Sequence, residues 1–196
     1  MLKDLWPRVA KGAAGFLLGL VFWWALAFPY ARLLAFLSEP VIRMTERPPV
    51  TRVIADGTEL TIDRADFPRD SPRPGLLLMD LTANFIVLTT LFAVNRRPLS
   101  DRNVSGVLLA SLALIVVHVA AVVVNVESIY ALRLGAWSDR HYGPVARNIW
   151  GAGAHFYSLI GAFGASFALW WLFRPSPPSA ANERAIKPRR ERSRVH

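Results

Sequence analysis

Residues Val104 to Val126 read VSGVLLASLALIVVHVAAVVVNV and contain no Lys, Arg, Asp or Glu. An α-helix needs about 20 apolar residues to cross a hydrocarbon core about 30 Å thick, and this stretch meets that length. Because an unpaired charge is costly in hydrocarbon, the absence of such residues fits the same setting. We therefore predict a transmembrane helix at residues 104–126.

Three other apolar runs of comparable length lie at residues 12–37, 75–94 and 148–173. The chain of 196 residues is 53% apolar and has a mean hydropathy of +0.31. The sequence therefore predicts an all-α membrane protein with four transmembrane helices in one membrane domain, residues 1–174. The basic tail, residues 175–196, has no apolar periodicity and is expected to be disordered.

Lys and Arg are unevenly divided among the segments outside these runs. Residues 1–11, the loop 95–103 and the segment after residue 173 carry the whole formal net charge of +9, and the charges of the remaining chain cancel. Because basic flanks are retained on the cytoplasmic side, we predict a multi-pass protein of the bacterial cytoplasmic (inner) membrane with both termini cytoplasmic. The tail lacks interleaved aromatic residues, so we interpret it as contacting anionic membrane lipid and not nucleic acid.

The N-terminal region leaves two interpretations open. Residues 1–27 have the basic start, the apolar run and the Ala-Leu-Ala ending of a cleaved secretory signal. The Trp23-Trp24 pair and the apolar residues that resume at Ala31 instead favour a helix that stays in the protein. Pro29 lacks a backbone donor, so we expect the first helix to kink or end there.

The segment 40–74 is the largest predicted extracytoplasmic piece. Within it, strand-forming residues flank Asp56-Gly57, which predicts a β-hairpin between the first two helices with a type I′ turn and positive φ at both central positions. About 35 residues are too few for an independent core. We therefore expect the hairpin to pack on the helices or on a partner.

Polar residues gather at the predicted outer ends of the helices. They are Asp80, Thr82, Asn84, Asn125, Glu127, Arg147, Asn148 and His155. One hypothesis is an outer-face polar cluster in which Asp80 or Glu127 pairs with Arg147; the alternative is hydrogen bonding that only holds the helices together. The chain has no cysteine, no metal-ligand set and no glycine-rich phosphate loop, so we predict no cofactor and no metal site.

Two helix faces carry periodic small or polar residues. Ser111, His118 and Asn125 recur every seven residues along the third predicted helix, and we expect His118 to be a neutral, hydrogen-bonded core residue. In the fourth predicted helix, small residues recur every four positions from Ala154 to Ser166. Such a face permits close helix approach, and we expect it, with the hairpin, to contact a membrane partner.

The order of these features resembles the exosortase and archaeosortase superfamily over residues 50–173. The matching elements are the hairpin 53–62, Asp80-Leu81-Thr82-Ala83, Asn125-Val126-Glu127-Ser128 and Ala154-His155-Phe156. The resemblance implies a catalytic set of Cys, Arg and His on the outer face of the cytoplasmic membrane. Leu81 stands in the cysteine position and Ser128 in the arginine position, so the family's nucleophile and oxyanion donor are both missing.

The chain is therefore most similar to non-catalytic members such as the exosortase H-associated membrane proteins. This resemblance implies an accessory protein that has no catalytic residues and binds an exosortase-like membrane enzyme or its substrate. Two alternatives stay open. One is a peptidase or transpeptidase with Thr82 or Ser128 as nucleophile and His155 as base. The other is an unrelated membrane scaffold or transporter subunit.

Overall fold

The computed structural model describes residues 2–46, 49–67, 72–95 and 97–175, and the predicted disordered tail lies outside them apart from Pro175. The helices are α1 (Leu2–Thr45), α2 (Leu78–Thr82), α3 (Asn84–Ala93), α4 (Asp101–Leu132), α5 (Ala136–His141), α6 (Pro144–Phe156), the π-helical turn η1 (Tyr157–Gly161) and α7 (Ala162–Phe173). The strands are β1 (Thr51–Asp56), β2 (Glu59–Arg64) and β3 (Gly75–Leu77).

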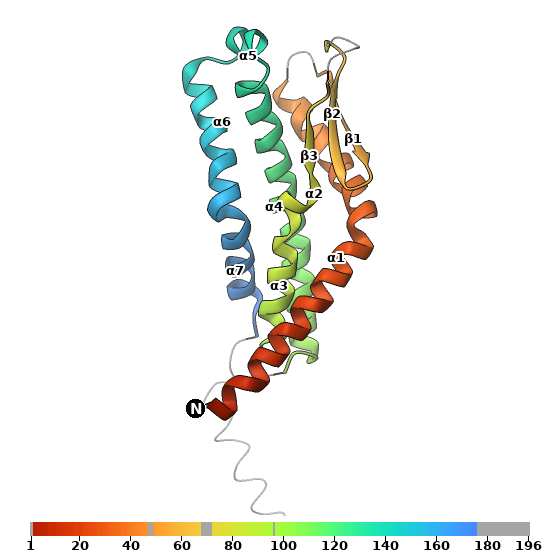
Figure 1. The fold of residues 1–196 in the computed structure, drawn as a ribbon, viewed down its shortest axis with the longest axis vertical. Coiled ribbons are helices and arrows are strands. Elements are labelled where there is room, and N and C mark those ends of the chain that lie inside the picture. Colours follow the sequence, from red (N-terminus) through yellow and green to blue (C-terminus); the bar gives the residue numbers. More distant parts are fainter. Residues whose placement is uncertain (1, 47–48, 68–71, 96, 176–196) are drawn as a thin grey trace, which may run out of the picture.

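The chain runs four times along the long axis of the molecule (Figure 1). α1 leads to the sheet at one end, α2 and α3 return, α4 runs back to α5, and α6 to α7 return again. In the described residues, three helices are long and apolar enough to cross a membrane: α1, α4 and the continuous helix from α6 to α7. The helical segment Leu78–Ala93 is apolar but shorter. Length alone thus supports three of the four predicted transmembrane helices.

α1 extends beyond the predicted range 12–37. It has 44 residues, which corresponds to about 66 Å, and contains Pro29 and Pro40 in its interior. Of the two outcomes expected at Pro29, an end of the helix is therefore wrong, because α1 continues to Thr45. A proline removes one hydrogen bond of the ladder, and the neighbouring Ala27, Ala31 and Leu34 are buried in the core and hold this part of α1 in place.

The predicted hairpin is present, but its turn differs from the prediction. β1 pairs antiparallel with β2, and Asp56 lies opposite Glu59, so Gly57 and Thr58 are the two central turn residues. Gly57 has φ +60°, and no described residue other than glycine has positive φ. Positive φ at the first central position alone is typical of a type II′ turn with glycine first, not of type I′.

A third strand, which the sequence analysis missed, extends the sheet in the order β1-β2-β3. It occupies Gly75–Leu77, the first residues of the predicted second transmembrane helix. The buried face of the sheet, with Leu60 and Ile62 fully covered, joins the same apolar core as α1 and α4. The sheet therefore packs on the helices, which is one of the two outcomes predicted for the hairpin.

Close packing of α1 on α3 depends on two glycines spaced four residues apart. A Cβ at Gly15 would lie 2.4 Å from Cβ of Ala93, and one at Gly19 would lie 2.1 Å from Oγ1 of Thr89. The Thr89 hydroxyl also lies 3.3 Å from the Gly15 carbonyl. This Gly-x-x-x-Gly pattern therefore serves packing within the chain.

Candidate functional site

The first polar cluster lies between the long helices and centres on His118. Its side chain is 1% exposed; Nδ1 lies 2.6 Å from the Tyr30 hydroxyl and Nε2 lies 2.7 Å from Oδ1 of Asn84. Both ring nitrogens thus have protein partners, which confirms the prediction of a hydrogen-bonded core histidine. We call Tyr30, Asn84, His118 and Ser166 the membrane network.

Asn84 and Ser166 connect two irregular helix segments within the membrane network. The second helical pass breaks at Ala83 between α2 and α3, and the fourth pass contains the π-helical turn η1. Nδ2 of Asn84 donates to the Ala162 carbonyl at 3.0 Å, and the Ser166 hydroxyl donates to the Asn84 carbonyl at 2.8 Å. Carbonyls near both irregularities therefore find donors on the facing helix, as backbone groups in hydrocarbon require.

A cavity of about 130 Å³ lies beside this network, between α1, α4 and the α2–α3 junction. Thr82, Tyr30 and His118 are among its lining residues, and the remaining lining is mainly apolar or aromatic. Oγ1 of Thr82 accepts from Nε1 of Trp23 at 2.8 Å and donates to the Leu78 carbonyl at 2.8 Å. The polar groups of these three lining residues are thus already bonded to the protein.

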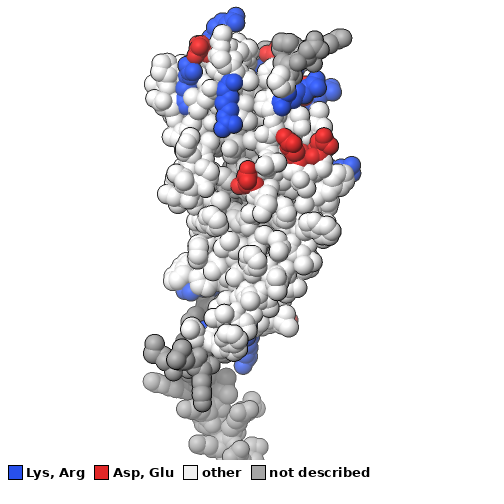
Figure 2. Space-filling model, in the orientation of Figure 1, with Lys and Arg blue, Asp and Glu red and all other residues white. Residues whose placement is uncertain are grey.

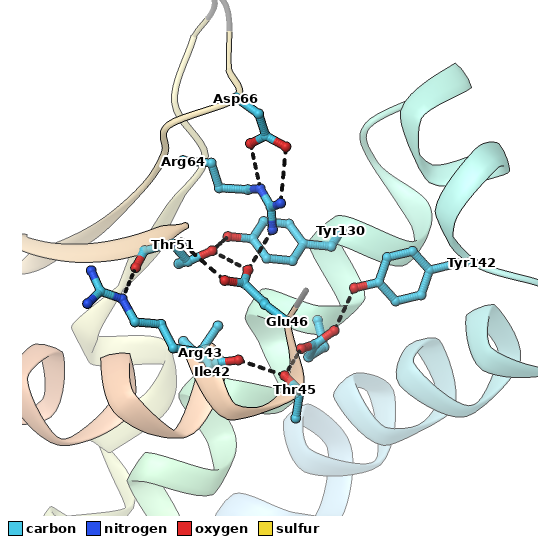
Figure 3. Close-up of polar contacts among 10 residues, drawn as sticks. Ile42, Arg43, Thr45, Glu46, Thr51, Arg64, Asp66, Tyr130 and Tyr142 are labelled. Carbon is cyan, nitrogen blue, oxygen red and sulfur yellow. Dashed lines mark hydrogen bonds and ion pairs between the residues drawn. The ribbon is translucent and has the colours of Figure 1, made fainter. Parts of the chain in front are cut away.

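The second polar cluster lies at the sheet end of the molecule and centres on Arg64 (Figure 3). The Arg64 side chain is 7% exposed and forms an ion pair of 2.5 Å with Glu46, itself 5% exposed. Nε and Nη2 of Arg64 also donate to the two carboxylate oxygens of Asp66. The guanidinium lies 4.9 Å from each of the Tyr130 and Trp137 ring centroids, a cation–π distance.

The contacts of this second cluster join the sheet to α4 and to the end of α1. Thr51 bonds to Glu46 and to the Tyr130 hydroxyl, so β1, α4 and the chain after α1 meet at one point. Because of its hydrogen bonds with Arg64, the pKa of the Asp66 carboxyl is lower than its ordinary value. A buried cation with two carboxylate partners and two aromatic neighbours is a fully compensated charge. We call Glu46, Thr51, Arg64, Asp66 and Tyr130 the outer network.

Glu127 is buried next to the outer network and holds two further segments. Its carboxylate accepts from the Thr45 hydroxyl at the end of α1 and from the Tyr142 hydroxyl between α5 and α6, both at 2.7 Å. Burial, and then the Glu127 carboxylate, raise the pKa of the Tyr142 hydroxyl above its ordinary value. Glu127 therefore links the first, third and fourth helical passes at the end of the molecule that carries the sheet.

The predicted pairing of Asp80 or Glu127 with Arg147 is wrong. Arg147 pairs with Asp139 at 2.7 Å and donates to the Ala131 carbonyl at 3.0 Å. Asp80 is exposed on α2 and forms no ion pair in the described residues. The cause is the α5 segment, which follows α4 and places Asp139 within reach of Arg147.

The other predicted site residues do not form one cluster. Thr82 and Asn84 lie in or beside the membrane network, whereas the one side-chain partner of Asn125 among the described residues is the Ala121 carbonyl of its own helix. Asn148 is exposed. His155 is exposed as well, and its Nδ1 lies 2.9 Å from the Gly151 carbonyl one turn earlier.

The small-residue face of the fourth pass is largely occupied within the chain. Ala162 and Ser166 are buried, and both bond to Asn84 through the contacts given above. Ala162 and Ser166 thus pack within the chain, and contact of a partner with the rest of this face stays a prediction. Ser158 remains exposed.

The sequence analysis missed Arg64, although a signal for its burial exists. Leu60, Ile62 and Arg64 alternate along β2, so all three share the face that packs on the helices. Tyr130 carries no comparable local signal, because its partner Thr51 lies 79 residues away in the sequence. Comparisons of the chain with protein-family models, with curated proteins and with solved structures give no match.

Proposed function

We propose that the chain is a four-pass protein of the bacterial inner membrane with the sheet outside and both termini in the cytoplasm. The charge division supports this orientation, and the alternating directions of α1, α2–α3, α4 and α6–α7 (Figure 1) are consistent with four passes. Figure 2 supports the placement, since charged side chains lie towards the two ends of the face shown and leave an uncharged band between them. In this proposal, β3 completes the shorter second pass at the outer surface.

Within that membrane, we propose a non-catalytic accessory role in an exosortase-type sorting system, in which the chain binds the sorting enzyme or its substrate. The link to sorting rests on the resemblance of residues 50–173. The non-catalytic part rests on one observation: the polar side chains at the positions that match the exosortase motifs bind other groups of this chain. Thr82 bonds to Trp23 and Leu78, Asn125 bonds to its own helix, and so does His155.

The hydrogen bonds of Thr82 and His155 differ from those that a hydroxyl nucleophile and its base would form. Such a nucleophile requires a base within hydrogen-bond reach and a donor for the developing oxyanion. The described contacts of Thr82 include no histidine, and those of His155 include no hydroxyl, carboxylate or amide side chain. The exposed sheet end and the buried polar networks instead favour a rigid binding module.

Reconstitution in liposomes tests the proposal. We expect purified chain alone to leave a sorting-signal substrate uncleaved, and expect it to co-purify with an exosortase-like enzyme from the same genome and to increase processing when that enzyme is limiting. Cleavage by the chain alone that is lost in Thr82→Ala or Ser128→Ala would replace the proposal with the hydroxyl-nucleophile enzyme. Absence of both co-purification and any effect on processing would leave an unrelated scaffold or transporter subunit as the better interpretation.

A further inference from the structure

The two outer edges of the sheet differ in whether side chains of the chain bind their backbone groups. On β1, the backbone groups of Thr51 and Val53 point away from β2 because both residues lie at non-hydrogen-bonded positions of the ladder. Side chains from α1 and the residue after it bind these groups. Arg43 donates to the Thr51 carbonyl at 2.7 Å, and Glu39 and Glu46 accept from the Val53 and Thr51 N–H groups at 3.1 Å.

Among the described residues, no side chain covers β3 in this way. Ile62 N–H donates to the Pro74 carbonyl and Leu78 N–H to the Thr58 carbonyl, which fixes the even-numbered residues as those that face β2. The N–H groups of Gly75 and Leu77 therefore point to the open edge, and no hydrogen bond to them occurs among the described residues. Gly75 is exposed, and Leu77 is 56% exposed. An uncovered strand edge is a template for one further strand.

Two carboxylates without an ion pair lie beside this edge, whereas the cation Arg73, two residues before Gly75, pairs with Asp63. A carboxylate oxygen of Glu59 lies across Gly75, 1.7 Å from where a Cβ would be, and Asp80 lies in the first turn of α2. Both side chains are exposed, and neither forms an ion pair in the described part of the chain. Figure 2 shows acidic side chains gathered on this face below the outer end. A bound strand that carries Lys or Arg would complement them.

We infer that the β3 edge binds an extended, basic peptide segment of a partner protein by strand addition, with the N–H groups of Gly75 and Leu77 as backbone donors and Glu59 and Asp80 as partners for its cationic side chains. This inference rests on the proposed binding role and names its surface. Because β3 leads directly into α2, the segment bound would lie next to the membrane. The protected β1 edge leaves β3 as the side of the sheet that is open to addition.

Leu77→Pro gives a selective test. Leu77 has φ −71°, which proline adopts, and its N–H makes no bond to β2, so the substitution removes one edge donor while leaving the sheet ladder in place. Leu77→Ala is the matched control, because it removes the same side chain and keeps the N–H. The probe is a capped, fluorescein-labelled octapeptide of alternating Lys and Val, titrated against full-length protein in phosphatidylcholine nanodiscs by fluorescence anisotropy.

We expect Leu77→Pro to raise Kd at least tenfold and Leu77→Ala to change it less than threefold. Glu59→Gln with Asp80→Asn should weaken binding and flatten its salt dependence. A peptide that is N-methylated at every residue lacks backbone donors on both of its edges and should not bind the wild-type protein, which tests strand addition without altering the fold.

Three results would overturn the inference: no binding of the Lys-Val peptide up to 1 mM, equal binding by Leu77→Pro and Leu77→Ala, or equal affinity for a Glu-Val peptide. A dimer that cross-links at residue 77 and excludes the peptide would assign the edge to a second copy instead. If the peptide binds but the chain has no effect on sorting in liposomes, the β3 edge is still a peptide-binding surface and only the sorting role is rejected.

Discussion

Asn84 is the residue at which the second, third and fourth helical passes meet. It bonds to His118 on α4 and to the Ala162 carbonyl, and its own carbonyl accepts from Ser166. Its side chain is 2% exposed. If the amide is removed, the groups that it binds therefore stay buried, and water does not take the place of the amide. A buried polar atom without a partner costs more than the bond itself contributes.

We therefore expect Asn84→Ala to lower the free energy of unfolding by about 1–2 kcal/mol, the upper range for side-chain hydrogen bonds between helices in membranes. Asn125→Ala is the matched control, because that amide bonds only within its own helix. Unfolding by SDS in mixed micelles measures both variants. Equal losses for the two would show that Asn84 contributes no interhelical stabilisation.

Arg64 and Asp66 make the sheet end of the molecule sensitive to acid. The pKa of Asp66 is lowered by its hydrogen bonds with Arg64, so the folded state favours the charged carboxylate. This stabilisation is present above the unfolded value of about 3.9 and is lost as pH falls through the lower folded pKa. Asp66 is 43% exposed, so solvent screening limits the effect.

Between pH 6 and pH 3, the wild-type protein should thus lose more thermal stability than Asp66→Asn. Circular dichroism melts in a non-ionic detergent measure the difference. Asp139→Asn provides a control acid, since Asp139 pairs with Arg147 away from the sheet. An identical pH response of wild type and Asp66→Asn would contradict the role given to the Arg64–Asp66 pair.

At the scale of elements, the contact between α1 and α3 depends on the absence of side-chain atoms at Gly15 and Gly19. A methyl group at Gly19 would meet the Thr89 hydroxyl at 2.1 Å and Cα of Ile86 at 3.1 Å. Thr89 has little freedom to move, because it bonds to the Ile86 carbonyl. At Gly12 the nearest atom, in Val94, would lie 3.4 Å away, an ordinary contact.

Gly19→Ala is expected to destabilise the protein by roughly 1–3 kcal/mol through overpacking, whereas Gly12→Ala should be close to neutral. The SDS unfolding assay measures both, and Thr89→Ala in the Gly19→Ala background should restore part of the loss, because it removes the hydroxyl that the added methyl group would meet. If Gly12→Ala proves as harmful as Gly19→Ala, the loss reflects glycine in general and not this helix contact.

Elements with a local signal could be predicted from the sequence. The long apolar runs predicted α1, α4 and the α6–α7 helix, and Asp56-Gly57 between strand-forming residues predicted the hairpin. β3 could not be separated from the apolar run that follows it, because its three residues are apolar and are defined by pairing with β2. The break at Ala83 and the turn η1 likewise depend on contacts between distant helices.

The candidate polar residues show the same limit at the residue level. The predicted burial and hydrogen bonding of His118 followed from its depth in an apolar helix. Arg147 pairs with Asp139 of α5, an element that the sequence did not predict. Glu127 binds Thr45 and Tyr142, which belong to other segments of the chain. Pairing across the fold is tertiary information that a single sequence does not carry.

At the scale of the whole molecule, the polar groups are concentrated where helical passes or the sheet must be fixed to one another. The membrane network joins three passes, and the outer network with Glu127 joins the sheet to the outer helix ends. Between the two ends, the face shown in Figure 2 is uncharged. This distribution supports the proposed arrangement, in which the helices lie in the bilayer and the sheet lies on one side of it.

Cysteine labelling in intact cells tests this arrangement most directly, because the natural chain contains no cysteine. Thr58 is exposed at the hairpin turn, and Leu99, in the loop before α4, is 90% exposed. A membrane-impermeant maleimide should label Thr58→Cys in intact cells, and Leu99→Cys only after the membrane is permeabilised. Labelling of Leu99→Cys but not of Thr58→Cys in intact cells would place the sheet in the cytoplasm and contradict the account.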